Sequence, residues 1–115
     1  MSDLQTATVN STGTAAAITL PLVLVADPDG SSRTRRADQL ESRGFRVVLA
    51  RTSFETIVKA ACLLPDVILM AASLAHDPDN ETAGLLSTCP ATAHIPIVQL
   101  TAGRRLPSRV LALAR

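Results

Sequence analysis

The sequence contains few aromatic residues and almost no lysine. Phe45 and Phe54 are its only aromatic side chains, Lys59 is its only lysine, and the formal net charge is +1. Single-stranded nucleic acid is commonly bound in a strongly basic groove by aromatic side chains that stack on the bases. The composition therefore argues against a nucleic-acid partner.

Cysteine is also scarce. Cys62 and Cys89 are the only two cysteines, and they lie far apart in the chain. Two cysteines at this spacing build neither a disulfide scaffold nor a metal site. We expect both to be reduced and buried as small apolar residues.

The N-terminal residues lack the features of a targeting signal. Residues 14–26 are largely apolar, but the residues before them include no lysine or arginine and carry Asp3, and the apolar stretch ends at Asp27. A secretory signal needs a basic start, and a membrane span needs about 20 apolar residues. We therefore expect a cytoplasmic protein with no membrane partner, in which residues 1–19 form a flexible lead and residues 20–115 form one domain.

The rest of the chain alternates between strand-like and helix-like segments. Continuous apolar runs predict buried strands at residues 20–26, 45–50, 66–72 and 95–102. Gly44 is suited to end a helix over residues 31–43. Thr52 and Glu55 have the spacing of a capping box, which opens a second helix that ends at Pro65.

The second predicted helix has an apolar stripe. Five apolar residues recur along it at helical spacing: Phe54, Ile57, Val58, Ala61 and Cys62. A stripe of this kind normally faces the core. Two further helices are predicted, a short one over Leu85 and Leu86 that Pro90 ends, and a last one over residues 106–115.

Strands that alternate with helices of this length predict an α/β fold with a parallel sheet and right-handed crossovers. Ligands of such sheets bind beyond the carboxyl ends of the strands. Those ends are residues 27–29, 71–73 and 101–102. No glycine-rich phosphate-binding pattern follows the first strand, which argues against a dinucleotide or P-loop site.

Four phrases in order resemble the response-regulator receiver domain: LVLVADPDGSSR, GFRVV, PDVILM and PATAHIPIVQLTA. The resemblance covers residues 20–105. It implies a flavodoxin-like (CheY-like) doubly wound parallel sheet in three α/β/α layers, with strand order 2-1-3-4-5, and a role in bacterial two-component signalling. Because the chain stops at Arg115, we expect it to lack the family's usual last strand and helix.

The resemblance also implies which residues stand at the family's phosphorylation site. Receivers transfer a phosphoryl group from a phosphohistidine to an aspartate, with Mg²⁺ on acidic side chains and a hydroxyl and a lysine on the phosphoryl oxygens. The matching positions form a degenerate site: Asp27, Pro28, Asp29, Ala71 and Thr101. Proline offers no side-chain oxygen, an alanine methyl cannot be phosphorylated, and no lysine follows Thr101. Asp27 and Asp29 are weak metal candidates, so we expect no Mg²⁺, no other cofactor and no enzymatic activity.

Alternatives remain open at this site. Ser73, Asp77 and Asp79 lie near Ala71 in the sequence and would be acceptors outside the family pattern, which would leave a still switchable phosphorelay receiver. Asp27 is equally suited to cap the helix that follows it. A small enzyme or nucleotide-binding domain is a further alternative.

The enzyme alternative has little support from the residues. His76 and His94 are the only histidines, and neither has a recognisable nucleophile beside it in the sequence. His76 lies in the loop next to the degenerate site and is the better of the two.

The first predicted helix is unusually polar for a receiver. Ser32, Arg35, Arg36 and Gln39 stand where the family carries large apolar residues. Burying unpaired arginines is costly, so we expect this helix to cover the sheet poorly. A second copy of the chain, another protein or the last ten residues would then cover the exposed face, and we favour a homodimer.

The candidate interaction surface follows from this polar helix and consists of Arg33, Arg35, Arg36 and Gln39. An alternative in which Arg33, Arg35, Arg36 and Arg43 bind nucleic-acid phosphates is less favoured than a solvated helix face balanced by acidic residues. The hypothesis is thus a phosphorylation-independent receiver-like interaction module whose partner is itself or a signalling protein.

Overall fold

In the computed structural model of the chain, the residues described are 20–75, 82–100 and 110. They form one parallel sheet of four strands in the order β3-β2-β4-β5. The strands are β2 (Leu22–Ala26), β3 (Arg46–Ala50), β4 (Val67–Met70) and β5 (Ile97–Gln99). In chain order this is 2-1-3-4, so the expected topology is confirmed for the four strands described.

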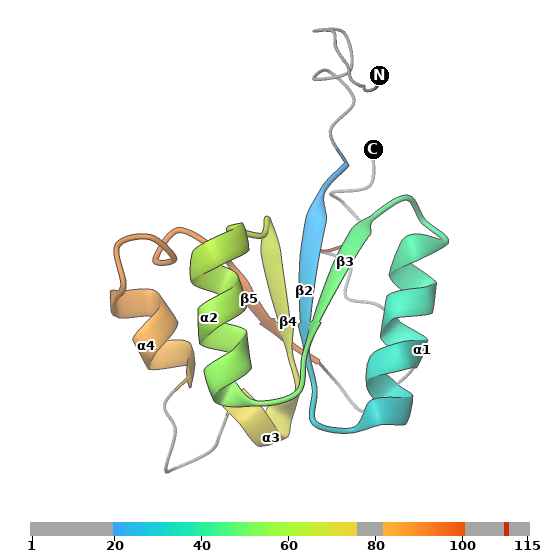
Figure 1. Ribbon diagram of the computed structural model, residues 1–115, viewed down its shortest axis with the longest axis horizontal. Helices are drawn as coiled ribbons and strands as arrows, with labels where there is room; N and C mark the ends of the chain where they lie inside the picture. Colours follow the sequence, from blue (N-terminus) through green and yellow to red (C-terminus); the bar gives the residue numbers. More distant parts are fainter. Residues whose placement is uncertain (1–19, 76–81, 101–109, 111–115) are drawn as a thin grey trace, which may run out of the picture.

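The helices lie on both faces of the sheet. They are α1 (Gly30–Glu41), α2 (Ser53–Leu63), α3 (Ala72–Ala75) and α4 (Thr82–Thr88). Figure 1 shows α1 on one face, α2 and α4 on the other, and α3 at the end of the sheet where the strands terminate. This is the three-layer α/β/α arrangement expected from the alternating pattern. The sequence did not predict α3, whose four residues were taken as strand and loop.

Local signals explain where the helices begin and end. Glu55 donates its backbone N–H to Thr52 Oγ1 at 3.0 Å, as the capping-box spacing predicts. Gly44 has φ of +90°, a left-handed conformation that glycine adopts without strain. Leu64 ends α2 with φ of 49°, which is unusual for a side chain of this size, and Pro65 follows it.

The two central strands are buried on both faces within a single chain. β2 is fully buried from Val23 to Ala26, and every residue of β4 is buried. On the α1 face, the apolar core consists of Val23, Val25, Leu40, Phe45, Val67, Leu69, Leu100 and Val110. Val110 is helical and fully buried there, so a residue near the end of the chain completes this face. Of the three alternatives for covering this face, the position of Val110 supports the one in which the last residues of the chain cover it.

The expected poor coverage by α1 is wrong. Arg36 lies on the buried side of the helix with only 2% of its surface exposed, beside Ala37 and the fully buried Leu40. The long aliphatic stem of arginine can cover apolar surface while the guanidinium reaches a polar group. Arg36 therefore works as part of the packing face, and it is not part of an exposed interaction surface.

The apolar stripe predicted on α2 does not face the core. Phe54 and Val58 are exposed, as are Ala61 and Cys62, and only Ile57 packs against the core. The buried side consists of the small residues Ser53, Thr56 and Ala60. Small side chains let the helix lie close to the sheet, and this closeness turns the larger residues outward.

The burial expected of the cysteines is also wrong. Cys62 and Cys89 are both free thiols, and both are exposed.

Some expectations concern residues outside the described part of the chain. These are the flexible lead, the polar loop with His76, Asp77 and Asp79, the position of Thr101, and most of the last predicted helix. Within residues 20–75 and 82–100, no helix has the length and apolar character needed to cross a lipid bilayer.

Candidate functional site

Three backbone hydrogen bonds bring the carboxyl ends of the strands together. Asp27 donates its N–H to the carbonyl of Ala50 at 3.0 Å, and Ala71 donates to Ala26 at 2.8 Å. Leu100 donates to Met70 at 2.8 Å at the next strand along. Asp27 and Ala71 therefore lie side by side, as the sequence predicts. Thr101, which follows Leu100, lies outside the described residues.

Asp27 is buried, and its carboxylate accepts a hydrogen bond from the neighbouring backbone. The side chain is 6% exposed, and its Oδ1 accepts the backbone N–H of Asp29 at 2.9 Å. Its main-chain carbonyl accepts Arg33 Nη1 at 2.9 Å. An aspartate that bonds the backbone two residues later stabilises a tight turn. Asp27 thus shapes the turn before α1, while the capping role suggested for it belongs to Asp29.

Pro28 and Asp29 are both exposed at this turn. Asp29 is the N-cap of α1, where its Oδ1 accepts the N–H of Ser31 at 3.3 Å. One of the two carboxylate oxygens of Asp29, the residue that would substitute for the missing ligand at Pro28, is therefore bonded to the helix. In the part of the chain that the structure describes, no three acidic, histidine or cysteine side chains gather as a metal site would require.

Ala71 sits at the expected acceptor position with a chemically inert side chain. Its carbonyl accepts the N–H groups of Leu74 and Ala75, both at 3.0 Å, which starts α3 directly after the strand. Ser73 is exposed on this short helix. The strand residue before Ala71 is the fully buried Met70.

Arginine side chains supply positive charge next to Asp27. Burial lowers the pKa of the Arg36 guanidinium, the nearby charge of Arg35 lowers it further, and the carboxylate of Asp27 raises it. The influence of Asp27 is the smallest of the three, and it indicates an electrostatic interaction between the buried arginine and the buried aspartate. The sequence analysis missed this role of Arg36. Its position four residues before Leu40 was the available signal, because residues four apart lie on the same side of a helix.

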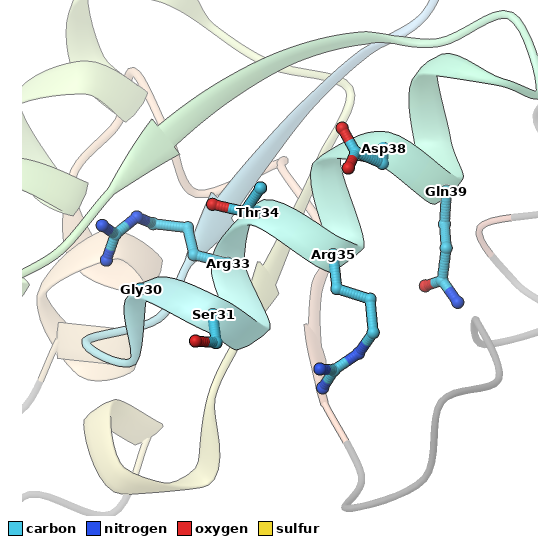
Figure 2. Close-up of a pocket in the computed structure, with 7 residues that line it drawn as sticks. All are labelled: Gly30, Ser31, Arg33, Thr34, Arg35, Asp38 and Gln39. Carbon is cyan, nitrogen blue, oxygen red and sulfur yellow. The ribbon is translucent and has the colours of Figure 1, made fainter.

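Residues along most of α1 line an open groove of about 820 Å³. Its lining residues are Gly30, Ser31, Arg33, Thr34, Arg35, Asp38 and Gln39. Figure 2 shows Ser31, Arg35 and Gln39 on one flank of the helix and Arg33 pointing away from them. Of the four residues in the candidate interaction surface, Arg33, Arg35 and Gln39 are thus in the groove and half-buried, and Arg36 is not.

The only lysine is engaged on α2, away from the degenerate site. Lys59 Nζ donates to the carbonyl of Leu49 at 2.5 Å and lies 3.3 Å from Glu55 Oε2. Among the described residues, His94 is exposed in the segment before β5.

Solved structures with this fold are response-regulator receiver domains. The N-terminal domain of a response regulator receiver protein from Methanoculleus marisnigri JR1 is 26% identical, with a TM-score of 0.66 over 84% of this chain and 80% of that one. The chemotaxis response regulator CheY4 of Vibrio cholerae is 23% identical, with a TM-score of 0.66 over 83% and 81%. The response regulator domain of Thermotoga maritima CheB is 23% identical, with a TM-score of 0.60 over 84% and 71%.

No protein-family model matches the sequence, and no curated protein is similar to it at a significant level. The fold is nevertheless that of the receiver domains, which confirms the resemblance and the flavodoxin-like fold class.

Proposed function

We propose that this chain is a phosphorylation-independent receiver-like module that binds proteins in two-component signalling. The receiver fold supports the signalling role. The single observation that carries the rest is Ala71, whose methyl group lies beside Asp27 at the end of the sheet where a receiver needs its acceptor carboxylate.

We also propose that this module works without Mg²⁺. A magnesium ion prefers several oxygen ligands in octahedral geometry. Among the described residues at the strand ends, Asp27 is the one buried carboxylate; its Oδ1 accepts the Asp29 N–H, and Pro28 contributes no side-chain oxygen. The carboxylate of Asp27 raises the pKa of the Arg36 guanidinium, so a divalent cation on Asp27 would be repelled by the positive charge of that arginine.

The module would then remain in one state, since no phosphoryl group arrives to change the positions of its surfaces. Its output would be set by the concentration of its partner. A cytoplasmic location and a bacterial signalling pathway belong to this proposal as expectations.

Incubation with acetyl phosphate and Mg²⁺, followed by intact-mass measurement, tests the proposal. We expect no phosphoryl adduct, while an intact receiver domain treated in parallel should gain one. A stable gain of one phosphoryl group by this chain would overturn the proposal and favour a switchable receiver with an acceptor outside the family pattern.

A matched pair of variants sharpens the test. Ala71→Asp restores an acceptor, and Pro28→Asp combined with Ala71→Asp restores a metal ligand as well. We expect phosphorylation only in the double variant, because the acceptor alone lacks a cation to neutralise the incoming phosphoryl group. Phosphorylation of the unmodified chain at a level equal to the double variant would contradict this account.

A further inference from the structure

The outward side of α2 is apolar and exposed. Phe54, Val58 and Ala61 are spaced four and three residues apart, which places them in one row along the helix. Phe54 is 77% exposed and Val58 is 41% exposed, and α4, which packs against α2, adds Leu85 at 54%. We call these four residues the α2 stripe. Scattered apolar residues on a surface are ordinary, whereas a contiguous patch marks a binding site.

Among the described residues, the charged side chains of α2 lie on one side of the α2 stripe. Lys59 bonds the Leu49 carbonyl of β3 and pairs with Glu55 at 3.3 Å, so both charges lie on the side of α2 that faces β3. Leu85 lies on the opposite side, because Figure 1 shows α4 on one side of α2 and β3 on the other. The surface thus has a polar border and an apolar border.

A second copy of the chain complements this surface when the two α2 helices run antiparallel. A two-fold axis perpendicular to the helices brings each border against the same border of the other copy. Glu55 then faces Lys59 of the second copy, and Leu85 faces its own counterpart. Phe54 lies opposite the small residue Ala61 of the second copy, and Val58 lies near the axis.

Other arrangements fit this surface less well. Parallel helices would set the apolar border with Leu85 against the charged border with Glu55 and Lys59. A net charge of +1 also leaves little long-range repulsion between two copies.

We propose that the α2 stripe is a self-association surface through which two copies of this chain form an antiparallel dimer. The proposal deepens the interaction role proposed above and rests on it. It differs from a dimer built over the α1 face, because that face is already covered within one chain. The stripe has four residues on each copy, far fewer than the roughly 20 to 30 residues per partner of a stable complex, so we expect a weak dimer with a Kd on the order of 10 µM.

Analytical ultracentrifugation of the full chain across the micromolar range tests the proposal. Reductant is included because Cys62 and Cys89 are exposed thiols that could link two copies chemically. We expect a monomer–dimer equilibrium. Phe54→Asp should weaken it by about 30-fold or more, since a charge would be buried at the centre of the contact. Leu20→Asp is the matched control, because Leu20 is an exposed apolar residue outside the stripe.

Charge reversal tests the antiparallel arrangement itself. Glu55→Lys gives a copy whose polar border carries two positive charges, and Lys59→Glu gives a copy whose polar border carries two negative charges. Each variant alone should associate more weakly than the unmodified chain, and an equimolar mixture should recover association as a mixed dimer. Circular dichroism of each variant establishes that α2 remains folded.

A cross-link provides a readout that does not depend on affinity. In a background with Cys62→Ser and Cys89→Ser, Val58→Cys should form a disulfide-linked dimer under mild oxidation, because Val58 lies near the two-fold axis. Leu20→Cys in the same background should not.

Three results would overturn the proposal: a monomer at every concentration, a dimer that Phe54→Asp leaves intact, or charge variants that do not recover on mixing. None of these results bears on phosphorylation. A chain that dimerises as expected and also accepts phosphate would refute the proposed function and leave the interface in place.

Discussion

α1 and α2 flank the sheet on opposite faces and distribute their polar residues in opposite ways. α1 has a polar sequence and yet buries Arg36 against the core, together with Ala37 and Leu40. α2 is the more apolar helix and leaves Phe54 and Val58 exposed. The polarity of a helix therefore does not decide how much of it is buried.

The difference follows from the size and shape of the side chains that meet the sheet. α2 packs through Ser53, Thr56 and Ala60, whose small volumes allow a close approach, and the Thr56 hydroxyl is satisfied by the carbonyl of Thr52 at 2.7 Å. Arg36 on α1 is buried together with Ala37 and Leu40, where its long aliphatic stem can pack, and its guanidinium interacts electrostatically with Asp27. The size and shape of a side chain thus decide whether it is buried against the sheet. The exposed apolar residues of α2 are available to contact another molecule.

Truncating one large apolar residue on each helix is the strongest way to test this comparison. Leu40→Ala should lower the free energy of unfolding by about 2 to 5 kcal/mol, because Leu40 is fully buried in the α1-side core. Phe54→Ala should change it by less than about 0.5 kcal/mol, because Phe54 is mostly exposed. Urea denaturation at low protein concentration measures both. Equal losses in the two variants would show that Phe54 is part of the monomer core.

Arg36 offers a second test of intermediate size. Arg36→Ala should cost about 2 kcal/mol, because it removes both packing volume and the positive neighbour of the buried Asp27. Arg36→Met keeps most of the volume and should recover part of the loss in thermal or urea unfolding. Arg43→Ala, on an exposed residue just after α1, is the matched control and should have little effect. An Arg36→Ala variant as stable as Arg43→Ala would mean that the buried arginine contributes nothing.

The smallest expected effect concerns the cap of α2 and depends on pH. The Arg51 N–H bonds Glu55 at 2.6 Å and, with help from Lys59, lowers the pKa of that carboxyl below its usual value. A carboxyl whose pKa is lowered in the folded state stabilises the fold above its unfolded pKa, near 4.3, and this contribution is lost as the pH falls through the lowered folded value. Glu55→Gln should therefore destabilise the protein at pH 7 and have less effect at pH 3, as measured by urea denaturation. An equal loss of unfolding free energy at pH 7 and at pH 3 would contradict a role for the negative charge of Glu55.

The sequence was sufficient to predict the fold because its strands are unusually clear. Continuous apolar runs such as Val67–Met70 have no helical alternative of that length, and Gly44 and Thr52 mark helix ends through local chemistry. The order of the strands came from the resemblance to receiver domains. The side-by-side placement of Asp27 and Ala71 followed once the strands were assigned, because parallel strands end at the same edge of the sheet.

The side chains that surround the site were harder to predict. Helical periodicity identifies an apolar row, but it does not show which face of α2 is buried when the opposite face consists of small residues such as Ala60. Likewise, an arginine on a helix is normally assigned to solvent. Arg36 and Asp27 interact only in the folded chain, and no local sequence pattern predicts this interaction.

The bond between Lys59 and Leu49 has a consequence for how the protein avoids aggregation. β3 is an outer strand of the sheet, and alternate residues of such a strand point their carbonyls outward. The carbonyl of Ala50 points toward β2 and accepts the N–H of Asp27. The carbonyl of Leu49 therefore points away from β2, and it accepts a hydrogen bond from Lys59 Nζ. A foreign strand that adds to this edge would have to displace the ammonium group. Lys59, the single lysine of the chain, therefore hinders the addition of a further strand at this edge.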